Sequence, residues 1–247
     1  MKTKVSVIVP FYKNVYLLNK AINSIFKQSY KNYEIIIIYD NPEKKLFSFL
    51  KTLKNKKKVK IIYNKKNLGA GPSRNKGIKV SKSKYIAFLD SDDTWHKHKL
   101  LKQINFMENN KYLASHTSYQ KVNLNGECYA TRYAFDLDYN KLVNSCDIGL
   151  STVILNKKIL QNKSLFPSIK TKEDYVLWLK IAKSGIVFYG MKSILTKWQN
   201  TPNSLSKSIL QKLKDSFTVY NKYENFNFIR SIYRVLILSL NYLLKNL

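Results

Sequence analysis

The first half of the chain alternates short apolar runs with stretches whose apolar residues recur at helical spacing. The run at 35–39 is uninterrupted, which is typical of a strand buried on both faces of a parallel sheet. Similar strand-like runs lie at 5–9, 59–63 and 85–89. Helical spacing between the runs is clearest at Leu18, Ala21, Ile22 and Ile25.

This alternation predicts an α/β fold with a mostly parallel central sheet and covering helices. In such sheets ligands bind outside the carboxyl ends of the strands. Those ends are residues 10–12, Asp40 and residues 90–93. With 45% hydrophobic residues, the chain can bury a sizeable core.

The second half is less regular. Asn125 and Gly126, between strand-like runs, predict a hairpin. The remaining pattern predicts strands at 151–155 and 186–189 and helices at 173–183 and from Leu210 onward. No run of 18 apolar residues occurs, so no membrane-spanning helix is expected. The two cysteines lack a CxxC motif and are expected to be thiols in a reducing cytosol.

The chain is strongly basic, with 44 Lys and Arg, 15 Asp and Glu, and a formal net charge of +29. Such a balance favours an anionic partner: nucleic acid, a phospholipid surface or a phosphorylated substrate. Most of the basic residues are Lys, and a composition rich in Lys, Asn, Ile and Tyr also arises from A/T-rich codons. A solvated basic surface is therefore an equal alternative.

Three carboxylates follow the run at 85–89: Asp90, Asp92 and Asp93. Clustered carboxylates repel one another unless a cation lies between them. Mg²⁺ is often held by one or two carboxylates together with substrate phosphates, so the cluster predicts a divalent metal site. The alternative is that Asp92 or Asp93 caps the helix before Leu100. His96 and His98, nearby, are interpreted as surface residues.

Two other segments have residues suited to chemistry. In NLGAGPSRNKG, at 67–77, glycines let the backbone approach a ligand, and Arg74 could reach a phosphate or a carboxylate. Glu173 and Asp174 form the second segment. One of these acids could act as a general base on an acceptor hydroxyl, or both could simply begin a helix.

In this order the segments resemble glycosyltransferase family 2. The resemblance rests on VSVIVPFY at 5–12, YEIIII at 33–38, the segment at 67–77, FLDSDDTW at 88–95, and Glu173, Asp174 and Trp178. It implies the glycosyltransferase A-type fold. Residues 1–110 would be a Rossmann-like half that binds a nucleotide sugar, 111–205 an acceptor half, and 206–247 a C-terminal helical tail.

The resemblance also implies roles for individual residues. Those expected at the donor nucleotide are Pro10, Phe11, Tyr12, Asp40, Asn67, Gly69, Arg74, Asp90 and Ser91. Asp90 and Asp92 would hold a divalent metal, Mn²⁺ or Mg²⁺, with Asp92 in direct contact and Asp93 in a supporting role. Asp174 would be the catalytic base, with Glu173 and Trp178 at the acceptor. Trp178 could instead pack in the core.

The chain departs from the family pattern in one segment that bears on donor recognition. The family usually has Asp-Asp-Gly-Ser after the second strand, whereas this chain has Tyr39, Asp40, Asn41 and Pro42. Asp40 can still accept a hydrogen bond from uracil or ribose. Tyr39 is expected to stack on the donor or to change the choice of donor.

The C-terminal residues show a helical apolar pattern with Arg230 and Arg234 near its start. Its apolar members are Ile229, Ile232, Tyr233, Leu236, Leu240, Leu243 and Leu244. The pattern suits either a helix lying on an anionic leaflet or a helix that packs on the domain core. In the first case, removing the residues after Asn225 is expected to reduce membrane association.

These features predict an inverting, metal-dependent glycosyltransferase of the bacterial cytoplasm, peripheral on the inner face of the membrane. Its expected donor is a UDP-sugar, with galactose or glucose favoured. Its expected acceptor is a saccharide on a lipid diphosphate in lipopolysaccharide, O-antigen or capsule synthesis. One alternative is a family member that binds nucleotide sugars without catalysis. Another is a basic nucleic-acid-binding protein, which leaves the acidic clusters unexplained, so no nucleic acid partner is expected.

Overall fold

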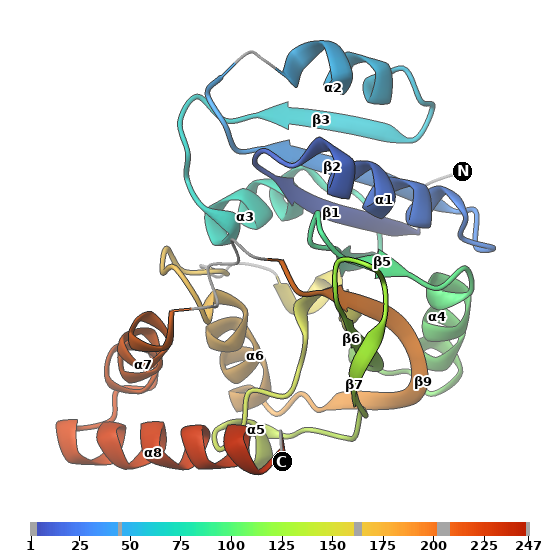
Figure 1. Cartoon of the computed structure of the whole chain (residues 1–247). Helices are drawn as coiled ribbons and strands as arrows, with labels where there is room; N and C mark the ends of the chain where they lie inside the picture. The colour runs from blue at the N-terminus through green and yellow to red at the C-terminus, as the bar shows by residue number, and fades with distance from the viewer. Residues whose placement is uncertain (1–3, 44–45, 161–164, 202–207, 246–247) are drawn as a thin grey trace.

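The computed structural model describes residues 4–43, 46–160, 165–201 and 208–245. They form one curled sheet with helices on both faces (Figure 1). Its first four strands are parallel and lie in the order β3 (Val59–Tyr63), β2 (Tyr33–Tyr39), β1 (Val5–Phe11) and β4 (Tyr85–Phe88). This is the order of a Rossmann-like half. The predicted α/β fold is confirmed.

Beyond β4 the sheet is mixed. The short strand β8 (Ile154–Asn156) is antiparallel to both β4 and β6 (Ala114–Val122). The long strand β9 (Phe188–Gln199) runs parallel to β6 and pairs with β5 (Thr94–Trp95). The hairpin predicted at Asn125 and Gly126 joins β6 to β7 (Cys128–Arg132).

Several of the predicted strand limits were wrong, and the strand expected at 186–189 is the much longer β9. The strand expected from residue 151 begins at Ile154, because Leu150–Thr152 forms a 3-10 turn, η2. The first strand was expected to end before Pro10, but β1 continues through Pro10 to Phe11. The Phe11 carbonyl accepts from Asp40 N–H beside β2, and the Ile8 carbonyl accepts from Leu89 N–H beside β4. The Pro10 nitrogen therefore faces the β4 side after β4 has ended, where its missing N–H breaks no ladder bond.

Helices cover both faces of the parallel strands. They are α1 (Val15–Phe26), α2 (Phe47–Lys54), α3 (Ala70–Val80), α4 (Lys99–Asn109), α5 (Tyr139–Leu142) and α6 (Glu173–Lys183). Val7 and Val9 of β1 enter a core with α1, α2 and α4. Ile8 enters a second core with α3 and α6. Successive residues of one strand are thus buried on opposite faces, as the apolar runs predicted.

Residues 208–245 contribute to the second core. They comprise α7 (Ile209–Thr218), a π-helical turn η5 (Val219–Tyr223) and α8 (Phe228–Leu244). Val219, Tyr220 and Leu238 are buried there with residues of α6. These residues therefore pack in the same body as α6, within residues 111–205. No described helix is long and apolar enough to cross a bilayer.

Candidate active site

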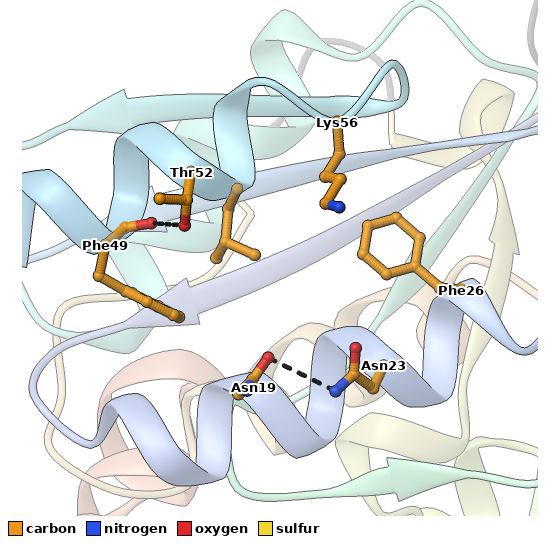
Figure 2. A pocket seen from close by; sticks show the side chains of 7 residues that line it. Asn19, Asn23, Phe26, Phe49, Thr52 and Lys56 are labelled. Carbon is orange, nitrogen blue, oxygen red and sulfur yellow. Dashed lines mark hydrogen bonds between the residues drawn. The ribbon is translucent and has the colours of Figure 1, made fainter.

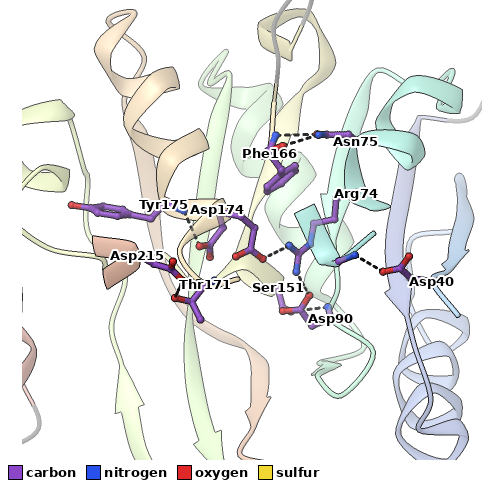
Figure 3. A network of polar contacts seen from close by, with 12 residues as sticks. Asp40, Arg74, Asn75, Asp90, Ser151, Phe166, Thr171, Asp174, Tyr175 and Asp215 are labelled. Carbon is purple, nitrogen blue, oxygen red and sulfur yellow. Dashed lines mark hydrogen bonds and ion pairs between the residues drawn. The ribbon is translucent and has the colours of Figure 1, made fainter. Parts of the chain in front are cut away.

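Polar side chains meet where β2 and β4 end and where α3 and α6 begin (Figure 3). Asp40 follows β2, Asp90 lies just beyond β4, and Arg74 lies in α3. Glu173 and Asp174 are the first two residues of α6. Segments far apart in the sequence thus contribute to one site, at the sheet edge that the sequence predicted.

Asp40 fixes the glycine turn before α3. Its Oδ1 accepts from Asn64 Nδ2 at 2.7 Å and from Leu68 N–H at 2.8 Å, and its Oδ2 accepts from Gly69 N–H at 2.8 Å. Gly69 has a φ of 84°, a left-handed conformation that glycine adopts without steric cost. Asn67, which is exposed, also accepts from Gly69 N–H. The contact of Asp40 with uracil or ribose stays a prediction.

The start of α3 packs closely on the segment before α6. Asn75 Nδ2 donates to the Phe166 carbonyl at 2.8 Å, and Phe166 N–H donates to Asn75 Oδ1 at 2.9 Å. A Cβ on Gly71 would lie 2.6 Å from the Pro167 carbonyl oxygen. Gly71 therefore permits a backbone contact within the protein, which a larger residue would prevent.

Arg74 joins the two halves of the site. Its Nη2 donates to Asp90 Oδ1 and its Nη1 to Glu173 Oε1, each at 2.6 Å. The guanidinium is buried and lies over the Phe166 ring, 5.4 Å from the centroid. Burial alone would lower the pKa of Arg74, but the two carboxylates raise the pKa, so the residue stays charged. Of the two expected partners, phosphate or carboxylate, the structure shows carboxylates. The place of Arg74 beside the nucleotide stays a prediction.

Asp90 and Asp92 remain partly exposed on the turn after β4, with Ser91 between them. Burial, and then the charge of Asp90, raise the pKa of Asp92 to about 6. Because Arg74 is shared with Glu173, the aspartate pair lacks a full countercharge.

A divalent cation fits this aspartate pair. Mg²⁺ and Mn²⁺ take oxygen ligands, commonly one or two carboxylates with substrate phosphates and water. Among the described residues, no group of three His, Cys, Asp or Glu could hold a metal. A metal on Asp90 and Asp92 would therefore need donor phosphates or water to complete its shell.

Asp93 anchors the turn that follows β4, while its supporting role at a metal stays a prediction. It is buried, and its Oδ1 accepts from Gln199 N–H at 2.9 Å, which ties the turn to the end of β9. Burial, and then the charge of Asp92, raise the pKa of Asp93 well above its ordinary value. The helix-cap alternative was wrong, because α4 begins at Lys99 with His98 as its N-cap residue.

The first turn of α6 places two acids side by side. Its N-cap residue, Lys172, has a φ of 67°, a conformation that is costly for any residue other than glycine. Glu173 is held by Arg74, and Asp174 Oδ1 accepts from Tyr175 N–H at 2.7 Å. Burial, and then the charge of Glu173, raise the pKa of Asp174 to about 7. A carboxylate of this pKa can accept a proton at neutral pH.

Two polar residues that support the site were missed by sequence reasoning. Asp215 of α7 is buried, and its Oδ2 accepts from Thr171 N–H at 2.9 Å and from Thr171 Oγ1 at 2.8 Å, just before α6 (Figure 3). Ser151 Oγ accepts from Asp90 N–H at 3.0 Å. The scarcity of acids in this chain was a usable signal for Asp215. Ser151 had none.

Three aromatic residues do not lie where a ligand could reach them. Trp178 is 0% exposed and packs among Phe88, Phe166 and Phe188, so its predicted contact with an acceptor sugar was wrong. Phe11 is 2% exposed and stacks on Tyr39 at 5.6 Å, and Tyr39 donates to the Glu43 carbonyl.

The side chains of Phe11 and Tyr39 therefore face the core, and the predicted stacking of Tyr39 on the donor was wrong. An effect of Tyr39 on the choice of donor stays a prediction. The alternation along β1 turns Phe11 into the core with α1 and α2. Pro10, also buried, cannot present a surface to the nucleotide either. Tyr12 is the exposed member of this segment, with Lys13 Nζ 4.8 Å from its ring centroid.

A hollow of about 560 Å³ lies elsewhere, between α1 and α2 (Figure 2). It is lined by Asn19, Asn23, Phe26, Phe49, Thr52, Leu53 and Lys56. None of the predicted site residues lines this hollow. The candidate active site is therefore assigned to the carboxylates at the strand ends.

Sequence comparison settles the family. The model of glycosyl transferase family 2 matches residues 6–167. The chain belongs to glycosyltransferase family 2. UDP-Glc:alpha-D-GlcNAc-diphosphoundecaprenol beta-1,3-glucosyltransferase WfgD of Escherichia coli is 33% identical over 220 residues, which cover 87% of this chain and 84% of WfgD. The putative teichuronic acid biosynthesis glycosyltransferase TuaG of Bacillus subtilis is 30% identical over 236 residues, covering 93% of this chain and 92% of TuaG.

Other relatives are longer than this chain. An uncharacterised glycosyltransferase of Rickettsia felis is 38% identical over 189 residues, which cover 75% of this chain but 31% of the relative. A Rickettsia conorii relative shows the same identity and the same coverage.

Solved structures confirm the predicted glycosyltransferase A-type fold. Residues 1–349 of TarS from S. aureus, in complex with UDP-GlcNAc, align with a TM-score of 0.73 at 20% identity, over 90% of this chain and 65% of that one. The mannosyltransferase PcManGT from Pyrobaculum calidifontis, with GDP-Man and Mn²⁺, aligns with a TM-score of 0.69 at 13% identity, over 92% and 66%.

Proposed function

We propose that this chain transfers a hexose from a UDP-sugar to a saccharide on a lipid diphosphate, in the synthesis of a bacterial surface polysaccharide. The donor is UDP-glucose or UDP-galactose, and the site of action is the cytoplasmic face of the inner membrane. The names of two relatives support this class: WfgD uses UDP-Glc and a diphosphoundecaprenol-linked acceptor, and TuaG is assigned to teichuronic acid biosynthesis.

The observation that carries the proposal is the double ion pair of Arg74. One guanidinium bonds Asp90 beside the Asp-x-Asp pair and Glu173 at the start of α6, each at 2.6 Å. Asp174, whose pKa is raised to about 7, follows Glu173 directly. A base is thereby kept next to a donor-binding pair, and a displacement reaction requires that fixed placement.

In the proposed reaction Asp174 accepts the proton of the acceptor hydroxyl as the hydroxyl oxygen bonds to C1 of the sugar. The bond between C1 and the diphosphate oxygen breaks, and its electron pair leaves with UDP. Attack opposite the leaving group inverts C1, so an α-linked donor gives a β-linkage. Mn²⁺ or Mg²⁺ on Asp90 and Asp92 would supply charge neutralisation of the diphosphate. Glu173 and Arg74 keep α6 in place while Asp174 holds the proton.

The proposal is tested by a donor screen with the full chain. UDP-Glc, UDP-Gal, UDP-GlcNAc and GDP-Man are each offered with a lipid-diphosphate GlcNAc acceptor, in Mn²⁺, in Mg²⁺ and in EDTA, and products are identified by mass spectrometry. We expect metal-dependent transfer from a UDP-hexose. Binding of a nucleotide sugar without transfer or hydrolysis would favour the non-catalytic alternative. Transfer that is unaffected by EDTA would contradict the metal role.

The role of Asp174 is tested by the pH dependence of kcat/KM. Only the deprotonated base is active, so we expect kcat/KM to rise about tenfold per pH unit below 7 and to level above it. Asp174→Asn should lower kcat about a thousandfold. The matched control is Asp138→Asn: Asp138 caps α5, and asparagine caps equally well. If Asp174→Asn were as active as Asp138→Asn, another group would be the base.

A further inference from the structure

The last helix presents its apolar side to solvent. Seven residues of α8 between 41% and 80% exposed form what we call the outer stripe: Ile229, Ile232, Tyr233, Leu236, Leu240, Leu243 and Leu244. At ~100° per residue they fall within about 120° of one side of the helix. In Figure 1, α8 lies along the lower edge of the molecule, at the opposite end from α2 and β3.

The opposite side of α8 contacts the protein through both apolar and polar residues, and its Leu238 is buried in the second core. Arg234 Nη1 donates to Asn144 Oδ1, and Asn241 Nδ2 donates to the Asn144 carbonyl at 2.9 Å. Lys245, just after α8, pairs with Asp147 at 2.6 Å. An ordinary surface helix turns its apolar stripe inward. Here Leu238 and these polar contacts hold α8 to the protein, and the larger apolar set faces outward.

Exposed apolar residues continue onto α7. Phe217 of α7 packs edge-on against Phe228 of α8, with ring centroids 5.5 Å apart. Ile209, Leu210 and Leu213 of α7 are also exposed. We call these three residues and the outer stripe the α7–α8 face. Many large apolar residues exposed on two neighbouring helices mark an interaction site.

The charge around the α7–α8 face is positive. The acids of residues 208–245 are Asp215 and Glu224, and both are buried: Asp215 accepts from Thr171, and Glu224 pairs with Lys183 at 3.1 Å. Lys214, Lys222 and Arg230 are exposed on the same segment. A partner of this face must therefore tolerate both apolar residues and positive charge.

We propose that the α7–α8 face docks on the surface of an anionic bilayer, with α8 lying in the plane of the interface. Apolar residues would enter the acyl boundary, and Lys and Arg would meet lipid phosphates. Tyr233, in the outer stripe, has the amphipathic ring that is enriched at this boundary. A second copy of the chain is a poorer occupant, because it brings the same positive segment and a further formal charge of +29.

The experiment is flotation of the full chain with vesicles of phosphatidylcholine alone or mixed with phosphatidylglycerol. The variant is Tyr233→Glu, on the outer stripe, and the matched control is Tyr16→Glu, on α1, whose ring is 67% exposed. Because both rings are exposed, both variants should stay folded, and circular dichroism checks this. We expect the wild type to float with the anionic vesicles, Tyr233→Glu to lose about tenfold in partition coefficient, and Tyr16→Glu to match the wild type.

Three outcomes would overturn the proposal. The wild type could remain unbound in both vesicle preparations, or the two variants could partition equally. The third is a dimer, seen by light scattering, that Tyr233→Glu dissociates while vesicles leave it intact, which would assign the face to a second copy. None of these readouts depends on glycosyl transfer, so the docking surface and the proposed function can fail separately.

Discussion

At the scale of single residues, the geometry of Arg74 explains why this position needs a guanidinium. Its two terminal nitrogens point to carboxylates from different elements, Asp90 and Glu173. A lysine ammonium is a single point charge and cannot bond both carboxylates with the same planar fork. The residue is also buried, so its charge and those of its partners depend on one another.

We expect Arg74→Met to lower the free energy of unfolding by about 3 kcal/mol, because the Glu173 carboxylate, 12% exposed, loses its countercharge. Urea denaturation at neutral pH measures this. Adding Glu173→Gln should recover part of the loss, since the uncompensated charge is removed. The control, Arg230→Met, changes an exposed residue and should cost about 0.5 kcal/mol or less. Equal losses for the two arginines would refute a special role for the bridge.

At the scale of elements, α7 positions the segment that leads into α6. Asp215 receives two hydrogen bonds from Thr171, and Lys172 then adopts its left-handed conformation before Glu173 and Asp174 begin the helix. Strain of this kind persists only where the surroundings hold it. The same α7 contributes to the α7–α8 face, so docking there would also orient the acceptor side of the site.

We expect Asp215→Ala to lower kcat about tenfold while leaving the KM for the donor unchanged. The start of α6 loses the hydrogen bonds that hold it, whereas the contacts of the proposed donor half remain. Stability should fall by about 2 kcal/mol, since the buried Thr171 N–H loses its acceptor. Asp215→Asn keeps one acceptor oxygen and should recover part of the activity.

The matched control for Asp215 is Ser216→Ala. Ser216 is buried next to Asp215, but its hydroxyl donates to the Lys212 carbonyl within α7. Steady-state kinetics and urea denaturation are measured on both variants. A loss of stability in Asp215→Ala with an unchanged kcat would show that the tie to Thr171 is structural and does not position the base.

At the scale of the whole molecule, the described residues 208–245 contribute to the second core. Tyr220 is fully buried, its hydroxyl donates to the Val143 carbonyl at 2.8 Å, and it lies 3.0 Å from the Tyr175 hydroxyl of α6. The family match ends at residue 167, yet this later aromatic residue packs on α6, the helix whose second residue is Asp174.

We therefore expect Tyr220→Ala to lower the free energy of unfolding by about 4 kcal/mol, since a large buried ring leaves a cavity and unpaired polar groups. Tyr16→Ala, at an exposed site, should cost about 0.5 kcal/mol or less. Both are measured by urea denaturation of the full chain. A small loss for Tyr220→Ala would mean that residues 206–247 behave as a separate tail.

The sequence by itself determined the elements and the location of the site. Periodicity predicted β1 to β4 and their helices, because burial on both faces of a parallel sheet leaves uninterrupted apolar runs. Parallel strands joined by crossover helices end at the same edge of the sheet, so Asp40 and Asp90, which follow two such strands, were expected at one edge. The adjacent acids Glu173 and Asp174 could be noticed because acids are scarce in this chain, and the family resemblance then suggested Asp174 as the base.

Only the tertiary structure decided which residues these side chains contact and whether they face the core or the solvent. Phe11 and Trp178 belong to recognisable motifs, yet both are buried, because a motif does not specify whether a side chain faces the ligand or the core. The partner of Asp215 lies 44 residues away, beyond the reach of any local pattern. The stripe of α8 was visible in the sequence, but periodicity shows only that residues share a face. Its outward direction was set by the burial of Leu238 on the opposite side and by Asn144 and Asp147, which bind polar residues of α8 and Lys245 just after it.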